Sequence, residues 1–340
     1  MPSTMNIKLP KVGDERPGYF KTFRYPAGEI QTRISDVKYL KNIQDASRVV
    51  LNMEYTSGDD LIILAQVLDI IVRTAPHFKK KDDLISIELF VPYLPFGRAD
   101  RPFVEGDCIG LNVFVTQLVG VCNRFNVKKI ITLDNHNREA SYLIRREVSL
   151  TNGSLAVQEL FAEPYIMAAI KNTLDLWGCN HRGIGERTIN VLFPDEGAAF
   201  RYSIPNEIFG SVGTIKINKL FAKKKRNAET GEFLGFEVPD SIEFVSDAPI
   251  LIVDDICDGG GTFNGVFDEL VKNGSLLGPD KDTRVSLFVT HGIFSKGFNE
   301  LEKRFFRIYT TSSIIFAHHE EESFEKISRY IVEVFQIVYS

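Results

Sequence analysis

The chain has 340 residues, of which 44% are hydrophobic, and a formal net charge of −5. This length is enough for two domains with cores of their own, while the negative charge argues against a general nucleic-acid binder. No apolar run is long enough to span a membrane, and residues 1–18 lack the apolar core of a signal peptide. We therefore expect a cytoplasmic protein that binds neither nucleic acid nor membranes.

The four cysteines are widely separated along the chain. They are Cys108, Cys122, Cys179 and Cys257, and no two of them form a Cys-x-x-Cys pair. This spacing indicates neither a zinc site nor a disulfide framework. We expect all four to be reduced residues that pack inside the protein.

Helical and strand patterns alternate in the first half of the chain. In chain order, they predict a helix at 57–71, a strand at 85–91, a helix at 111–122 and a strand at 129–133. In both helices the apolar residues recur three and four positions apart, as expected of a face that packs on a core.

The second half repeats this alternation from about residue 150. The patterns predict helices at about 154–172 and 321–338, and strands at 189–193, 248–253 and 284–289. Strands that alternate with helices form parallel sheets covered by helices. We therefore expect an α/β protein with two similar domains, residues 1–149 and 150–340, each a mainly parallel sheet flanked by helices.

The most informative segment is residues 252–262, IVDDICDGGGT. An apolar strand ends there in carboxylates, glycines follow, and a helix is expected from Phe263. At such a junction, backbone N–H groups and the helix dipole can bind a phosphate, and the carboxylates can face a ribose or a cation. The segment is not a Walker loop, because no lysine follows the glycines.

The simplest alternative is a strand, an acidic turn and a helix that bind nothing. Asp254 and Asp255 are adjacent at the strand end, where their charges repel each other. This arrangement costs stability unless a ligand, a metal or a nearby cation compensates for it. We therefore favour a ligand site.

This loop resembles the ribose-5-phosphate loop of type I phosphoribosyltransferases and of ribose-phosphate pyrophosphokinases, the enzymes that make phosphoribosyl pyrophosphate (PRPP). Those loops read Asp-Asp, two apolar residues, then Asp-Thr-Gly-Gly-Thr, and Gly259 stands here in place of the first threonine. The resemblance implies two tandem phosphoribosyltransferase-like domains, with a ribose-5-phosphate site in the second. The residues of that site would be Asp195, Asp254, Asp255, Asp258, Gly259, Gly260, Gly261 and Thr262.

Three segments of the first half resemble ATP-binding parts of the pyrophosphokinases. Residues 91–101, VPYLPFGRADR, are similar to the family's Pro-Tyr-x-x-Tyr-x-Arg-Gln-Asp-Arg stretch, and residues 131–137, ITLDNHN, to its Asp-Leu-His. Residues 25–34 resemble a Phe-x-Asp-Gly-Glu segment that reaches the adenine of a neighbouring subunit. The ATP-binding residues that the resemblance implies are Tyr25, Glu29, Phe96, Arg98, Asp100, Arg101 and His136.

Two segments of the second half resemble further loops of the family. Residues 193–201, FPDEGAAFR, are similar to the loop that contacts the ribose phosphate and the metal, which implies that role for Asp195. Residues 219–232, KLFAKKKRNAETGE, resemble the mobile loop, with Lys224 and Arg226 on its catalytic positions. Consecutive cations usually form a solvated surface, yet this cluster lies between the two acidic loops, as it does in the family.

The resemblance spans roughly residues 20–315. It implies transfer of the β,γ-diphosphoryl group of MgATP to the C1 hydroxyl of ribose 5-phosphate, which gives PRPP and AMP. Mg²⁺ would arrive on ATP and be held in part by His136 and Asp195. A homo-oligomer, either a dimer or a hexamer built from dimers, is also implied.

Because of Gly259, a second acceptor remains an alternative to ribose 5-phosphate. Loss of the threonine side chain widens the phosphate pocket, so a larger acceptor such as ADP-ribose is the runner-up. A third reading is a non-catalytic regulatory relative, but such relatives tend to lose the metal histidine or the loop cations, which this chain keeps. A transferase that consumes PRPP is disfavoured by the second domain and by the ATP stretch.

Overall fold

A computed structural model of the chain divides into two compact units, Met1–Leu160 and Phe161–Ser340. The structure describes residues 3–13, 18–75, 85–137, 139–151, 154–178, 187–210, 213–226, 233–245, 248–275, 285–314 and 332–335. Both units are mixed α/β folds with parallel sheets flanked by helices, as the sequence predicts.

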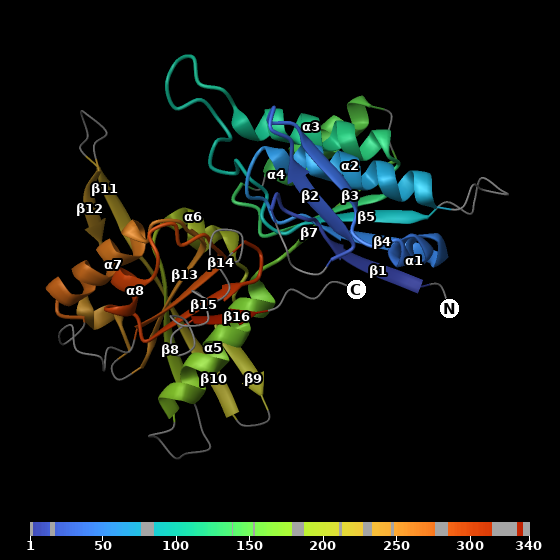
Figure 1. The fold of residues 1–340 in the computed structure, drawn as a ribbon. Coiled ribbons are helices and arrows are strands. Elements are labelled where there is room, and N and C mark those ends of the chain that lie inside the picture. The colour runs from blue at the N-terminus through green and yellow to red at the C-terminus, as the bar shows by residue number, and fades with distance from the viewer. Residues whose placement is uncertain are drawn as a thin grey trace. The chain divides into compact units, whose positions relative to one another are not determined.

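The first unit is built on a parallel sheet with the strand order β1-β4-β5-β6-β7. The strands are β1 (Ser3–Lys8), β4 (Ala46–Asn52), β5 (Ser86–Val91), β6 (Lys129–Leu133) and β7 (Ala156–Leu160). The helices are α1 (Lys38–Asp45), α2 (Asp59–Thr74), α3 (Gly110–Arg124) and α4 (Glu139–Leu150). Helix α3 packs beside both α2 and α4 (Figure 1). A hairpin of β2 (Phe20–Arg24) and β3 (Ile30–Ile34) packs on α2.

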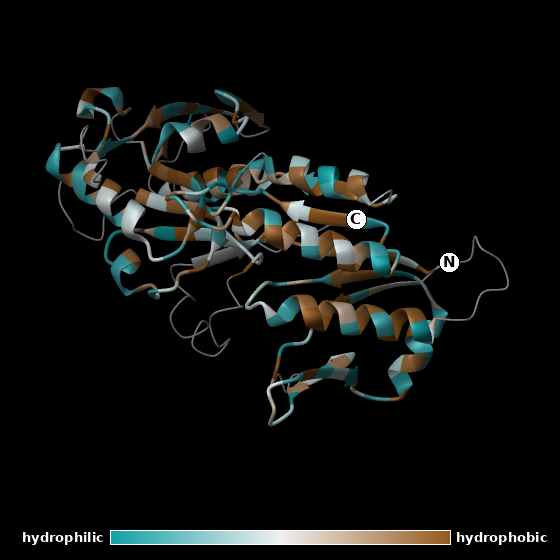
Figure 2. Ribbon diagram, turned by 90° about the horizontal axis from the view of Figure 1, so that it is seen from above, coloured by the Kyte–Doolittle hydropathy of each residue, from teal (hydrophilic) through white to brown (hydrophobic). Residues whose placement is uncertain are grey.

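Both faces of this sheet are covered. In β5 the consecutive residues Leu89, Phe90 and Val91 are all buried, and neighbouring side chains of a strand point to opposite faces. Apolar strands between helices that carry both polar and apolar sides are visible in Figure 2. The predicted helices at 57–71 and 111–122 and the predicted strands at 85–91 and 129–133 are confirmed.

The second unit has a sheet with the order β16-β15-β14-β13-β8-β10-β9, in which β9 alone among the described pairs is antiparallel. The strands are β8 (Arg187–Phe193), β9 (Glu207–Gly210), β10 (Gly213–Phe221), β13 (Ile250–Cys257), β14 (Val285–Gly292), β15 (Arg307–Thr311) and β16 (Val332–Phe335). A separate hairpin consists of β11 (Lys223–Arg226) and β12 (Phe233–Glu237). The helices are α5 (Glu163–Gly178), α6 (Glu196–Arg201), α7 (Gly261–Lys272) and α8 (Asn299–Glu302), with a 3-10 turn at Ser241–Glu243.

The central strand β13 explains why the sequence has a continuous apolar run there. Ile250 and Ile252 pack in a core with α7, whereas Leu251 and Val253 pack in a second core with α5. A strand covered on both faces needs apolar side chains at every position. The predicted strands at 189–193, 248–253 and 284–289 are confirmed.

The predicted helix at 154–172 is wrong in its first part. Residues Ala156–Leu160 form β7, which pairs with β6, and α5 begins only at Glu163. Pro164 gives the physical reason, because proline is accepted in the first turn of a helix but not in its interior. The first unit therefore extends to Leu160, beyond the expected limit at residue 149.

The predicted helix at 321–338 is wrong for Val332–Phe335, which pair in parallel with β15 as strand β16. The β-branched and aromatic residues at these positions favour a strand at a sheet edge despite their helical spacing. The rest of that prediction lies outside the described residues.

The cysteine prediction is confirmed for two positions. Cys122 and Cys257 are buried and free, and burial raises the pKa of both thiols, so they stay protonated. Cys108 is exposed, so the expectation that it packs inside is wrong. Cys179 lies outside the described residues. Among the described helices, none is both long and apolar enough to cross a bilayer.

Candidate active site

Several chemically distinctive segments meet at one edge of the second unit's sheet. Strands β10, β8, β13 and β14 are neighbours and run parallel, so their carboxyl ends lie at the same edge. Asp195 follows β8, Asp254 and Asp255 end β13, and the hairpin with Lys224 follows β10. Parallel α/β sheets bind ligands outside the carboxyl ends of their strands.

The predicted strand–glycine–helix junction is confirmed. Strand β13 ends at Cys257, and α7 begins at Gly261. Gly260 precedes the helix with a φ of +77°, a left-handed conformation that favours glycine. The first N–H groups of a helix have no partner within it. The junction can therefore donate several backbone hydrogen bonds to a phosphate.

Lys224 and Asp195 form an ion pair in the second unit. The Lys224 Nζ lies 2.8 Å from Asp195 Oδ2, and both side chains are 34% exposed. Asp195 Oδ1 also accepts the Ala198 N–H at 2.9 Å as the N-cap of α6. Burial raises the pKa of Asp195, but the Lys224 ammonium and the Ala198 N–H together outweigh it and hold that pKa below its usual value.

The two adjacent aspartates have different surroundings. Asp255 is buried, and its Oδ2 accepts a hydrogen bond from Arg201 Nη1 at 2.9 Å. Asp254 is half-buried, and its Oδ1 accepts the Asp255 N–H at 2.9 Å. Loss of water raises the pKa of Asp254 well above its usual value, and the Asp255 charge raises it further.

Arg201 is the site residue that the sequence reasoning missed. Its guanidinium supplies the cation that adjacent aspartates require, so the repulsion between them is compensated within the protein rather than by a ligand alone. The sequence did contain a signal for Arg201, because residues 193–201, which resemble a ligand-binding loop, end in this arginine. Arg201 closes α6, a helix that begins beside Asp195.

The hairpin that carries Lys224 is fixed to α7. Lys224 pairs with Phe236 across the hairpin, and directly opposite residues lie on the same face. A Cβ atom built on Gly265 of α7 would lie 2.7 Å from Phe236 Cε2, so only glycine allows this approach. Arg226 is the last residue of β11, and its side chain lies outside the described set.

Asp258 faces the segment after β14. Its Oδ1 accepts the Ser295 hydroxyl at 2.6 Å, and its backbone oxygen accepts the Ser295 N–H at 3.0 Å. Thr262 is half-buried in the first turn of α7. The structure thus places Asp195, Asp254, Asp255 and the residues 258–262 along one edge of the sheet.

The nucleotide stretch of the first unit follows β5 and contains an aromatic cluster. Phe96 is 43% exposed, and its ring centroid lies 5.9 Å from that of Tyr55 and 5.8 Å from that of Phe114. Its φ of +62° is unusual for a non-glycine residue and turns the chain beside the sheet edge. Arg98 and Arg101 are exposed, and the Arg101 guanidinium lies 5.8 Å from the Phe103 ring centroid.

His136 lies in the loop after β6, directly beside that stretch. A Cβ atom on Gly97 would lie 3.0 Å from His136 Cβ, and the Asn137 amide donates to Asp100 Oδ2. The structure therefore brings the loop that contains His136 and Asn137 beside the stretch that contains Gly97 and Asp100.

A buried polar network holds the His136 loop. Asn135 Nδ2 donates to Thr132 Oγ1 and to Ser141 Oγ, both at 3.0 Å. Ser141 Oγ donates to Glu159 Oε2 at 2.6 Å, and the Asn135 N–H donates to Glu159 Oε1 at 3.1 Å. Asn135 and Glu159 were not expected from the sequence, because their contact crosses from β6 to β7.

Tyr25 and Glu29 lie at the exposed turn of the β2–β3 hairpin. The Tyr25 N–H donates to the Glu29 backbone oxygen at 2.8 Å, and the Tyr25 ring meets that of Phe23 edge-on at 5.2 Å. Both side chains are thus available at the surface of the first unit.

The two expected metal ligands, His136 and Asp195, belong to different units. Within the described part of the chain, no three His, Cys, Asp or Glu residues are grouped so as to hold a metal. The Asp195 carboxylate is ionised and partly exposed, which suits a hard cation that keeps most of its water.

Known proteins with a similar sequence share one name. A ribose-phosphate pyrophosphokinase from Mesorhizobium japonicum is 24% identical over 270 residues, which cover 78% of this chain and 72% of that protein. One from Pyrococcus furiosus is 25% identical over 275 residues, covering 81% and 78%. One from Mycoplasmopsis pulmonis is 32% identical, but over only 119 residues, or 35% and 32%. No protein-family model matches the chain.

The fold also has a known counterpart. The crystal structure of phosphoribosylpyrophosphate synthetase from Mycobacterium smegmatis superposes with a TM-score of 0.64 over 98% of this chain and 94% of that one, at 16% identity. Over most of its length the chain is thus similar to ribose-phosphate pyrophosphokinases in sequence and to a phosphoribosylpyrophosphate synthetase in fold. It is a divergent relative, given the low identities.

Gly259 differs from the residue that pyrophosphokinases usually have at this position, and the structure shows what lies beside it. Gly259 stands where the pyrophosphokinase loop usually has threonine, and a Cβ atom built there would lie 3.2 Å from both Cδ and Cε of Lys296. The space beside Gly259 is therefore not open, as the sequence suggested, but is taken up by a lysine side chain.

Proposed function

We propose that this chain transfers the β,γ-diphosphoryl group of MgATP to the C1 hydroxyl of ribose 5-phosphate, giving PRPP and AMP. One observation carries the proposal: Lys224, Asp195, Asp254 and the 258–262 phosphate loop follow neighbouring strand ends of one sheet. The similarity to ribose-phosphate pyrophosphokinases, which are ATP-dependent diphosphotransferases, supports it.

The acceptor occupies the edge of β13 in this proposal. Its 5-phosphate accepts hydrogen bonds from the backbone of residues 258–262, at the positive end of α7. Asp254 and Asp255 accept hydrogen bonds from the ribose hydroxyls. Asp255 keeps Arg201 as its partner, so its position is fixed before the sugar arrives.

Lys224 and Arg226 act on the transferred group. The C1 oxygen attacks the β-phosphorus, its proton is lost, and the bond to the AMP oxygen breaks. Such transfers depend mainly on positioning and on cations that stabilise the phosphoryl oxygens. Arg226 lies two positions after Lys224 in β11.

MgATP binding exchanges the partners of the Lys224–Asp195 pair. In the structure, the ammonium and the carboxylate neutralise each other at 2.8 Å. When MgATP binds, Lys224 would move to the phosphate oxygens, and the Asp195 carboxylate would then be free to help hold the magnesium that ATP brings. His136, which lies beside Gly97 in the first unit, contributes to binding of ATP.

Release of AMP tests the proposal. The purified chain is incubated with MgATP and ribose 5-phosphate, and the products are identified by mass spectrometry. We expect AMP and PRPP in equal amounts, with no AMP when the acceptor is omitted. No AMP with ribose 5-phosphate, or ADP as the product, would contradict this mechanism.

ADP-ribose is a second candidate acceptor, because it offers the same C1 hydroxyl. The observation that favours it is the replacement of a threonine by Gly259 with the exposed Lys296 beside it. A cation there suits an acceptor with a second phosphate. The same incubation with ADP-ribose decides between them: AMP with ribose 5-phosphate alone excludes it.

We also propose that the chain forms a homo-oligomer in which the exposed Tyr25–Glu29 turn reaches the nucleotide of a neighbouring subunit. Light scattering of the purified protein measures the mass directly. A monomer of 38.4 kDa that retains full activity would contradict it.

A further inference from the structure

The segment that follows β14 lies along the phosphate loop. The N–H groups of Ile293 and Phe294 both donate to the Cys257 oxygen, at 2.9 and 3.1 Å. Ser295 then bonds to Asp258 through its N–H and its hydroxyl, at 3.0 and 2.6 Å. The next residue is Lys296, so its backbone position relative to the loop is fixed by several hydrogen bonds.

The side chain of Lys296 lies over Gly259. Its Cδ and Cε are 3.2 Å, and its Cγ 3.5 Å, from the position that a Cβ on Gly259 would take. The residue is exposed, so its ammonium reaches solvent beyond the loop. Glycine at 259 therefore makes room for the stem of a lysine.

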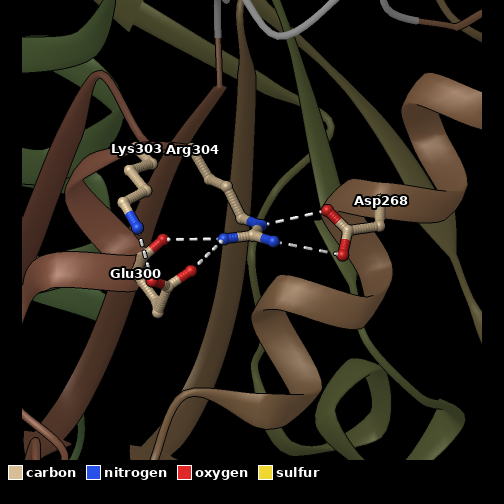
Figure 3. A network of polar contacts seen from close by, with 4 residues as sticks. All are labelled: Asp268, Glu300, Lys303 and Arg304. Atoms are coloured by element: carbon tan, nitrogen blue, oxygen red, sulfur yellow. Dashed lines mark hydrogen bonds and ion pairs between the residues drawn. The ribbon is translucent and has the colours of Figure 1, made fainter.

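The same segment is anchored on its other side. Leu301 of α8 packs against the loop, 3.1 Å from a Cβ position on Gly260. Arg304 holds Asp268 of α7 through Nε at 3.0 Å and Nη2 at 3.3 Å, while its Nη1 bonds to Glu300 (Figure 3). The chain on both sides of Lys296 is thus tied to the loop and its helix.

Lys296 also differs in its charge partners from three other lysines of the second unit. Lys224, Lys272 and Lys303 pair with Asp195, Glu269 and Glu300, respectively. Among the ion pairs of the described residues, none uses the Lys296 ammonium. A cation without a carboxylate partner, held beside backbone donors at a helix start, adds to the attraction for a phosphate.

We propose that Lys296 binds the phosphate group of the acceptor, in place of the hydroxyl that the loop lacks at position 259. The proposal rests on the proposed function, since it assigns the residue to the acceptor of that reaction. An ammonium offers three donors and a full charge, where threonine offers one neutral donor. Lys296 is therefore a specificity-determining residue for acceptors with an anionic group at C5.

The first test compares Lys296→Met with wild type, because methionine keeps an apolar stem over Gly259 and removes the charge. We expect KM for the acceptor that supports AMP release, ribose 5-phosphate or ADP-ribose, to rise about 10- to 100-fold, with KM for ATP unchanged. Lys296→Arg should restore most of the affinity. Lys272→Ala, which removes an exposed lysine from the far end of α7, should leave both constants unchanged.

The second test is a double-mutant cycle with Gly259→Thr. The backbone of Gly259 is not in the left-handed region, so threonine fits it, but its Cβ would meet the Lys296 stem at 3.2 Å. Each of Gly259→Thr and Lys296→Ala should weaken acceptor binding. The double variant regains a hydroxyl in vacated space, so its KM should lie within about threefold of wild type, which is strongly non-additive.

Two results overturn the proposal: an unchanged acceptor KM in Lys296→Met, or additive effects in the cycle. Calorimetric titration with ribose 5-phosphate separates it from the proposed function. If wild type binds the sugar phosphate but releases no AMP, the proposed reaction fails, and the affinity of Lys296→Met still decides the role of Lys296. Absence of binding of both ribose 5-phosphate and ADP-ribose to wild type would overturn both.

Discussion

The two units prepare their loops in different ways. In the second unit, charged groups are paired internally: Lys224 with Asp195, and Arg201 with Asp255. In the first unit, the His136 loop is held by a buried network centred on an amide and a hydroxyl, Asn135 and Ser141. The comparison teaches that the second unit holds its charges in internal ion pairs whose partners a ligand could exchange, whereas the His136 loop is held in a fixed geometry by buried hydrogen bonds.

Removal of Lys224 should give the largest effect. In the proposed reaction, Lys224→Ala removes a cation that acts on the transferred group, and we expect kcat to fall about a thousandfold, or roughly 4 kcal/mol, with little change in ATP affinity. Steady-state kinetics and calorimetry measure the two quantities. Lys225→Ala is the matched control, because Lys225 is the next residue and pairs with Glu237 at 3.6 Å. Equal loss of turnover and ATP affinity would contradict a catalytic role.

The buried pair in the second unit should matter most for stability. Arg201→Met leaves the Asp255 charge buried without its cation, which costs about 3 to 5 kcal/mol. Denaturant unfolding followed by fluorescence measures the loss. Arg187→Met removes a partner of Asp175 from a pair in which the aspartate is 66% exposed, and it should cost less than about 1 kcal/mol. Similar losses of unfolding free energy in the two variants would refute the distinction between a buried and an exposed ion pair.

The Asp254 carboxylate should lower the stability of the fold and strengthen binding of the acceptor. Because its pKa is raised in the folded protein, deprotonation of Asp254 opposes folding, and this penalty appears as pH rises above the ordinary value of 3.8. Asp254→Asn should therefore become increasingly more stable than wild type between pH 4 and neutrality. It should also raise the acceptor KM about tenfold or more. A variant that is less stable at pH 7, or weaker toward ATP, would refute the assignment.

Asp195 should show the opposite pH dependence. Its pKa is lowered in the folded protein, so the ionised carboxylate stabilises the fold above the ordinary value of 3.8, and this contribution is lost as pH falls through the lowered value. Asp195→Asn should therefore flatten the stability profile at acidic pH. Unfolding curves measured at several acidic pH values would show this flattening. An unchanged profile would mean that the Asp195 carboxylate does not stabilise the fold.

The smallest effect is expected in the first unit. Asn135→Ala removes two hydrogen bonds of 3.0 Å from a buried network, at a cost of about 1 to 3 kcal/mol. The displaced His136 loop should weaken ATP binding without changing acceptor affinity. Asn123→Ala, which removes an exposed bond to Thr151, should change stability by less than about 0.5 kcal/mol. Loss of acceptor affinity in Asn135→Ala would break the comparison between the units.

Sequence reasoning succeeded where the pattern is local. The strand, the glycines and the helix of residues 250–272 adjoin one another, and buried strands with breakers leave a clear signal. It failed where the partner is distant, as for Arg201, which contacts a residue 54 positions away. Likewise, Lys296 could not be connected with Gly259, because only the fold brings β14 beside β13.

The boundaries failed for a different reason. Residues 156–160 and 332–335 become strands through pairing with β6 and β15, and such pairing overrides a weak helical spacing. Pro164 was a local signal that could have corrected the first of these. The second had no such marker.

The contact of Gly265 with Phe236 restricts which residues this position of α7 can accept. The ring of Phe236 occupies the place of any side chain at this position, and Phe236 lies opposite Lys224 in the hairpin. A side chain at 265 would therefore have to displace this ring. A saturation mutagenesis screen should report large side chains at Gly265 as poorly tolerated, although the position lies on a helix and needs no contact with substrate.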